Sequence, residues 1–167
     1  KGVSHIGCMA HARRKFDVAK DNDPQLASHA LLLIQQLYAI ERKVKDQDLT
    51  SAQIKEVRLQ EASPVLNELK EWLDETYPKV LPKSAIGKAI AYSLKIWPQL
   101  TGYTQNGEWL IDNNTVENKI RPLALGRKNY LFAGSHKAAQ QAAMMYSFFG
   151  TCKMNEVQPL EWLTQTL

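Results

Sequence analysis

Apolar residues recur at helical spacing through the middle of the chain, which predicts a series of amphipathic helices there. The clearest stripe follows Asp23-Pro24, a pair that favours a helix start because aspartate caps the helix and proline fits its first position. Long helices separated by short polar breaks indicate an antiparallel helical bundle. The stripe after Asp23 comprises Leu26, Ala30, Leu33, Leu37, Ile40 and Val44.

Two more helices are predicted in this region. Thr50 favours the start of a second long helix, with Gln53 placed to close a capping box. Pro64 lies inside that helix and predicts a kink or a short interruption. Ser84 favours the start of a third helix, and Pro98 is expected to end it. The apolar face of the third helix comprises Ile86, Ile90, Leu94 and Trp97.

The N-terminal end has a different pattern. Val3 to Met9 predicts a short strand, and a helix is expected to start near Ala10. No strand precedes it, so we expect a fragment whose earlier sheet is missing. A lone edge strand needs a partner, so we also expect dimerisation through Val3–Met9, or disorder there.

Turn-forming residues from Gly102 to Gly107 predict a linker. A short helix that begins at Asn113 or Asn114 is then expected to bend or end at Pro122, because proline lacks the N–H that a helix interior needs. The segment from Gly126 to Gly134 is expected to form a loop.

Two helices are expected at the C-terminal end. Ser135 favours the start of the first because a serine side chain caps helices well, and Pro159 favours the start of the second. The apolar stripe of the first comprises Ala138, Ala142, Met145, Phe149 and Cys152.

Charge is distributed unevenly along the 167 residues, whose formal net charge is +4. Residues 1–16 sum to +4, residues 17–80 to −4 and residues 81–167 to +4. A polyanion would be attracted to both ends and repelled by the middle. Lysine-rich helix faces that are merely solvated explain the same pattern.

Two cysteines, Cys8 and Cys152, form no disulfide framework, which fits a reducing cytosol. No run of about eighteen apolar residues predicts a membrane span. Cys8-x-x-His11 has the spacing of half a zinc site, but no second pair of matching spacing follows, and a structural zinc ion needs four ligands. We therefore expect a buried Cys8 and an exposed or DNA-facing His11.

Glu117 is the most informative acid, because it lies among asparagines and cations where a helix is expected to start. Mg²⁺ prefers carboxylate oxygen, so Glu117 is a candidate metal ligand with neighbouring cations on phosphates. Two ordinary explanations compete. Asn114 and Glu117 have capping-box spacing, and Arg121 is placed for a helical ion pair.

Two basic segments are candidates for DNA contact. In Gly126 to Tyr130, Arg127 and Lys128 suit phosphates and Tyr130 suits stacking, although an exposed turn would look the same. Near the N-terminus, cations crowd the first turns of the expected helix, where they oppose its dipole; this favours a polyanionic partner. The cations of this second patch are Arg13, Arg14 and Lys15.

Six motifs in one order resemble the C-terminal part of bacterial transposases of the "insertion sequence sixty-six" family, over essentially the whole chain. They are C-x-x-H-A-R-R-K-F at 8–16, L-Y-x-I-E at 37–41, V-L-P-K-S-x-x-G-K-A-I at 80–90, I-D-N-N-x-x-E-x-x-I-R-P at 111–122, G-R-K-N-Y-L-F-A-G-S at 126–135 and Y-S-x-x-x-T-C-K-x-N at 146–155.

The resemblance implies a DDE transposase with a ribonuclease-H-like catalytic fold, in which two aspartates and one glutamate hold two Mg²⁺ ions. The family's glutamate falls on Glu117, and its two aspartates are expected before Lys1. The chain is therefore expected to hold Mg²⁺ weakly or not at all, and to neither cut nor join DNA alone. The intact parent would be a cytoplasmic, nucleoid-associated bacterial enzyme.

Together these observations predict a mainly α fold with at most one or two short strands. Residues 1–16 would end the sheet of a ribonuclease-H-like domain, 17–105 would form a helical insertion, and 106–167 would carry the acidic helix. Expected partners are insertion-sequence ends, target DNA and a second copy of the chain, with no membrane and no small-molecule substrate. The alternative is a non-catalytic helical module that binds DNA or protein.

Predicted DNA-contact or site-supporting residues are Asn113, Asn114, Asn118, Arg121, Arg127, Lys128, Arg13, Arg14 and Lys15.

Overall fold

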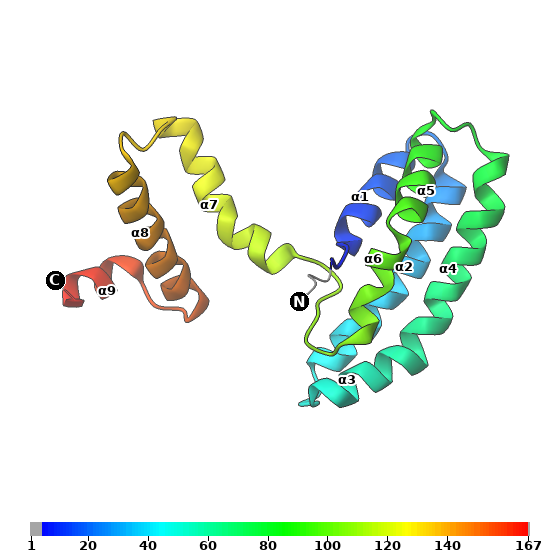
Figure 1. Cartoon of the computed structure of the whole chain (residues 1–167), viewed down its shortest axis with the longest axis horizontal. Helices are drawn as coiled ribbons and strands as arrows, with labels where there is room; N and C mark the ends of the chain where they lie inside the picture. The colour runs from blue at the N-terminus through cyan, green and yellow to red at the C-terminus, as the bar shows by residue number, and fades with distance from the viewer. Residues whose placement is uncertain (1–4, 167) are drawn as a thin grey trace. The chain divides into compact units, whose positions relative to one another are not determined.

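A computed structural model describes residues 5–166, and within them the regular structure is helical (Figure 1). The longer helices are α1 (Met9–Ala19), α2 (Pro24–Lys45), α3 (Ser51–Val57), α4 (Ser63–Thr76), α5 (Ala85–Lys95), α6 (Trp97–Thr101), α7 (Asn114–Tyr130), α8 (His136–Met154) and α9 (Pro159–Thr166). A π-helical turn spans Arg58–Ala62, and 3-10 turns span Tyr77–Lys79 and Gly102–Gln105.

The chain divides into two compact units between Asn113 and Asn114. The first, unit 1, contains α1 to α6, and the second, unit 2, contains α7 to α9. The predicted borders at residues 16 and 105 refer to domains of an intact parent protein and stay predictions.

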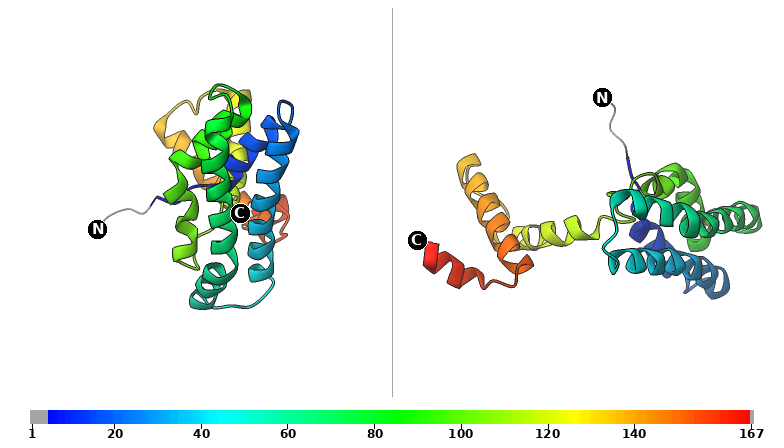
Figure 2. Two further views of the ribbon diagram at one scale, coloured as in Figure 1. Left: turned by 90° about the vertical axis from the view of Figure 1, so that its right-hand side faces the viewer. Right: turned by 90° about the horizontal axis from the view of Figure 1, so that it is seen from below.

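Unit 1 is a helical bundle in which α1, α2, α4 and α5 run alternately up and down (Figures 1 and 2). The predicted stripes supply part of its core: Leu33, Leu37 and Ile90 are each no more than 1% exposed. Phe16 on α1 and Leu73 on α4 complete it and are equally buried. Burying one such side chain contributes roughly 1.5–3 kcal/mol, so the apolar face of each helix fixes its position in the bundle.

The predicted helix starts are confirmed by their caps. The Asp23 carboxylate accepts a hydrogen bond from the Leu26 N–H at 3.0 Å, and the Ser84 hydroxyl accepts one from the Gly87 N–H at 3.0 Å. Thr50 and Gln53 form the complete capping box. These side chains satisfy N–H groups that the first turn of a helix leaves unpaired.

The interruption predicted at Pro64 is present as the π-helical turn Arg58–Ala62 between α3 and α4. Proline donates no N–H, so the regular ladder fails one turn before it. The side chain of Arg58, in this turn, points into unit 1 and is 2% exposed. Its guanidinium donates two hydrogen bonds to the Glu41 carboxylate, at 2.9 and 2.6 Å. Arg58 also donates to the carbonyl oxygens of Tyr103 and Asn106, at 3.1 and 2.9 Å.

The strand predicted at Val3–Met9 is wrong within the described residues, because residues 5–8 have no regular structure and Met9 begins α1; residues 3 and 4 lie outside them. Its N–H groups pair with residues far along the chain: Gly7 N–H donates to Gln99 O in α6 at 2.8 Å, and Met9 N–H donates to Ile111 O, before α7, at 3.0 Å. Dimerisation through this segment stays a prediction. The edge strand that motivated it is not formed within the described residues.

Two details near the end of unit 1 also differ from expectation. Pro98 does not close α5; it lies in the first turn of α6, a position that tolerates a missing N–H. The expected linker from Gly102 contains a 3-10 turn in which Tyr103 is fully buried. Composition alone indicated turns there, but the aromatic ring anchors the turn in the core.

In unit 2, α7 continues through Pro122 to Tyr130, so an end at Pro122 is wrong and the alternative of a bend there stays a prediction. The loop predicted from Gly126 to Gly134 is wrong for residues 126–130, which are helical, and confirmed for residues 131–134. Gly126 lies inside the helix, where an added Cβ would lie 2.5 Å from the Tyr146 hydroxyl oxygen, so a larger residue there would displace the tyrosine. The chain turns at Leu131, whose φ is 58°. The predicted cap at Ser135 and the start at Pro159 are confirmed.

Candidate catalytic and nucleic-acid-binding site

The last three residues of unit 1, Ile111 to Asn113, are held against the start of α1. Met9 N–H donates to Ile111 O at 3.0 Å, and Asn113 N–H points to the Cys8 sulfur at 3.5 Å. Ile111 is 6% exposed and belongs to the core. Cys8 is half-buried, not buried as predicted, because its sulfur faces this backbone at the surface.

Asp112 is fixed from a second direction. The Tyr38 hydroxyl on α2 donates a hydrogen bond of 2.8 Å to the Asp112 carboxylate. Burial of Tyr38, together with this hydrogen bond, raises the pKa of the phenol well above its usual value. The phenol therefore stays protonated and keeps donating to Asp112 at ordinary pH.

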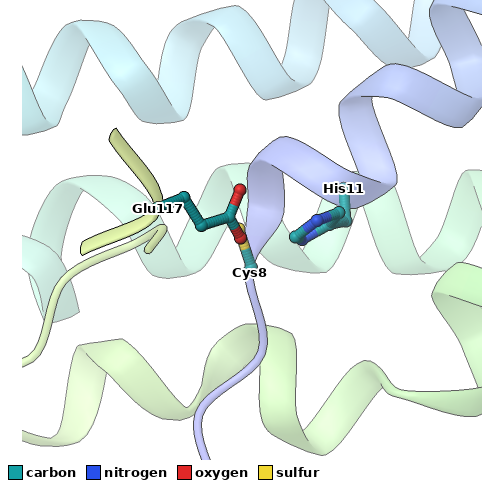
Figure 3. A group of neighbouring side chains, drawn as sticks. All are labelled: Cys8, His11 and Glu117. Atoms are coloured by element: carbon teal, nitrogen blue, oxygen red, sulfur yellow. The ribbon is translucent and has the colours of Figure 1, made fainter. Parts of the chain in front are cut away.

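Glu117 lies on the first turn of α7, four residues after Asn113, and is half-buried. Figure 3 draws Glu117 on α7, and Cys8 and His11 at the start of α1. A carboxylate near a helix N-terminus is favoured by the helix dipole. Because Asn113 is held by unit 1 and four peptide units span at most about 15 Å, the covalent chain alone keeps Glu117 close to this anchor.

The other predicted contact residues of unit 2 are exposed. Arg127 and Lys128 lie in the last turn of α7, not in a loop, and cations are favoured there by the helix dipole. This position gives them a structural role whether or not they bind DNA. Asn114, Asn118 and Arg121 on α7 are also exposed, as is Asn113 at the end of unit 1.

The predicted patch on α1 is exposed as well, at Arg13, Arg14 and Lys15. The ammonium of Lys15 lies over the ring of Tyr92 on α5, 4.5 Å from the ring centre. Lys88, also on α5, lines the same groove as Arg14 and Lys15. Sequence reasoning did not single out Lys88 or Tyr38, although both lie within the recognised motifs at 80–90 and 37–41.

Comparison with known proteins finds one family model, described as Transposase IS66 family, over residues 1–141. Three proteins of Sinorhizobium fredii are similar, each described as uncharacterized. The protein y4qI is 38% identical over 166 residues, covering 99% of this chain and 30% of that protein. The protein y4hP is 31% identical (99% and 32% covered), and y4jD is 32% identical (96% and 31% covered).

The chain therefore spans about a third of the length of these curated relatives. No solved structure matches it. Among residues 5–166, none of the helices combines the length and the apolar character that crossing a membrane requires.

Proposed function

The chain belongs to the IS66 family of transposases, and from this premise we propose that it contributes a metal-binding glutamate and DNA contacts to an enzyme that cleaves and joins insertion-sequence DNA ends. Glu117 is the proposed metal ligand. The remaining two-thirds of the relatives' length would supply the two aspartates and the ribonuclease-H-like sheet.

The anchoring of Ile111 to Asn113 is the observation that best supports this proposal. Three hydrogen bonds, from Met9, Tyr38 and Asn113, hold the segment that leads into α7. A metal-binding carboxylate must be held in place for two-metal chemistry, because the attacking and leaving oxygens have to be aligned. An anchor four residues before Glu117 limits how far the carboxylate can move from the ordered end of unit 1, which supports a role for Glu117 in such chemistry.

The metal ion, Glu117 and the cations of α7 would have separate roles. Bound Mg²⁺ would supply the activation of water and of a DNA 3′-hydroxyl for in-line attack on phosphodiesters. Glu117 would offer a carboxylate oxygen, the ligand type that Mg²⁺ prefers. Arg121, Arg127 and Lys128 would hold phosphates, with the exposed asparagines as hydrogen-bond donors beside them.

DNA binding by the 167-residue chain is the first test. A short fluorescein-labelled duplex should bind in a salt-dependent way, and Arg127→Ala/Lys128→Ala should reduce the salt slope by roughly two units. Lys45→Ala/Lys55→Ala removes the same charge from exposed positions of unit 1 and should leave the slope close to wild type. Equal slopes for all three proteins would contradict DNA contact by α7.

The isolated chain should not cut or join DNA ends with Mg²⁺, since one carboxylate cannot hold two metal ions. Metal-dependent joining by the purified chain would refute this part of the proposal.

A non-catalytic interaction module is the second candidate. It is favoured by the closed core of unit 1, from Met9 to Ile111, which needs nothing from unit 2. This alternative predicts that replacing Glu117 has no effect on any reaction of the intact parent protein.

A further inference from the structure

We propose that the groove between α1 and α5 binds the phosphate backbone of DNA, with Arg14 and Lys15 on one wall and Lys88 on the other. This inference rests on the proposed function, because it takes DNA as the partner. It adds a binding surface that lies wholly within unit 1.

The groove has a volume of about 630 Å³ and lies where α1 and α5 pack side by side (Figure 1). Its walls carry the long cationic side chains, and small residues leave space between them. From α1 it is lined by His11, Arg14, Lys15 and Val18, and from α5 by Ala85, Lys88, Ala89 and Tyr92.

The groove is positive and lacks a competing acid among its lining residues. The sequence of α5 contains no aspartate or glutamate, and the one acid of α1 is Asp17. Asp17 is paired with Lys20 at 3.0 Å, and this partner lowers the pKa of the carboxyl. Three cations with no acid between them attract a polyanion and raise its local concentration.

A cation–π contact between Lys15 on α1 and Tyr92 on α5 links the two walls. Lys15 reaches across from α1 and places its ammonium 4.5 Å from the centre of the Tyr92 ring. A cation held against an aromatic face loses less freedom when it binds phosphate than a lysine that is free in solvent. The packing of α1 on α5, whose buried residues include Ala12 on α1 and Ala89 on α5, keeps the walls at a fixed separation.

An extended polyanion fits this groove better than a small anion does. Arg14, Lys15 and Lys88 are exposed, and Val18 is 62% exposed, so the groove opens to solvent. A small anion in such an open place would keep its water, whereas a nucleic acid gains from several phosphate contacts and the release of counterions.

Fluorescence anisotropy with a short labelled DNA duplex of arbitrary sequence tests the proposal on the whole chain. Arg14→Ala/Lys88→Ala should weaken binding about tenfold at low salt and reduce the salt slope by roughly two units. The matched variant Lys45→Ala/Lys55→Ala removes two exposed cations outside the groove. It should bind like wild type.

Equal losses in the groove and control variants would overturn the proposal, because they would show only a general charge effect. Wild-type binding by Arg14→Ala/Lys88→Ala would also overturn the groove proposal. If only Arg127→Ala/Lys128→Ala lost binding, the groove proposal would fail and the proposed function would still hold. Tighter, groove-dependent binding of an RNA duplex, or competition by millimolar inorganic phosphate, would show that DNA is not the ligand. Circular dichroism of each variant checks that the helices are retained.

Discussion

Unit 1 and unit 2 are both helical, but they bury their apolar residues very differently. Unit 1 closes a core in which many side chains are almost inaccessible. Among the described residues of unit 2, Cys152 alone is buried, and large apolar side chains such as Phe132 (77% exposed) and Leu160 (75% exposed) face solvent. The difference separates a self-sufficient bundle from a segment that draws little stability from its own packing.

The stripe on α8 shows what this difference means for sequence reasoning. Ala138, Ala142, Met145 and Phe149 follow a helical period as predicted, yet they line an open groove of about 560 Å³ within unit 2 and not a core. Periodicity indicates that a helix has an apolar face, but it does not say what covers that face.

The largest contrast is expected at the buried ion pair of unit 1. Arg58→Met would leave the Glu41 carboxylate without its partner and remove two hydrogen bonds to backbone carbonyls. We expect the free energy of unfolding of unit 1 to fall by roughly 3–5 kcal/mol. Hydrogen exchange resolved by segment should show the loss in α2 to α6 and little change in α8 and α9.

A surface pair provides the control. Lys43 and Glu61 form an exposed ion pair, so Lys43→Met should cost about 1 kcal/mol or less. Equal destabilisation by Lys43→Met and Arg58→Met would show that Arg58 is not a structural centre of unit 1.

The next contrast compares one substitution in both units. Leu37 is fully buried and Leu160 is 75% exposed. Leu37→Ala should lower the free energy of unfolding by about 2–5 kcal/mol, because it leaves a cavity in a packed core. Leu160→Ala should change it by roughly 0.5 kcal/mol or less in urea unfolding. A similar cost at both positions would mean that α9 is buried in solution.

A smaller effect is expected where unit 1 anchors the residues before α7. Tyr38→Phe removes the hydrogen bond to Asp112 and should cost about 1 kcal/mol at neutral pH. The same variant should speed amide exchange at Ile111 to Asn113. Tyr77→Phe, at an exposed tyrosine, is the matched control and should be neutral.

The hydrogen bond from Tyr38 to Asp112 should make the free energy of unfolding depend on pH in the alkaline range. The pKa of Tyr38 is raised in the folded chain, so unfolded chains lose the phenol proton first once the pH exceeds the usual value of 10.0. The free energy of unfolding should therefore fall as pH rises above about 10, and fall less steeply in Tyr38→Phe. Parallel curves for wild type and Tyr38→Phe would contradict the buried, hydrogen-bonded phenol.

Much of unit 1 was predictable because local signals agree with its packing. Asp23-Pro24, Thr50 with Gln53, and Ser84 are caps whose effect depends on neighbouring backbone N–H groups only. The course of α7 was not predictable in this way. Pro122 and Gly126 are local helix breakers, yet the helix passes through both, and Tyr130 and Tyr146 lie in the space that a side chain at Gly126 would fill.

The candidate site was predicted in part. Glu117 and the cations of α1 and α7 were identified from residue type and motif. The anchor from Tyr38 to Asp112 joins residues 74 positions apart, and the opposition of Lys15 and Lys88 depends on the packing of two helices. Neither relation has a signal in local spacing, so only the fold reveals them.

Strand joining by the intact parent protein, which contains this chain, tests the central claim most directly. With labelled insertion-sequence ends and Mg²⁺, Glu117→Gln should lower the joining rate by about a hundredfold or more, while DNA binding stays close to wild type. Glu161→Gln, at an exposed glutamate of α9, should join at the wild-type rate. Joining by Glu117→Gln at the wild-type rate would contradict the assignment of Glu117 as a metal ligand.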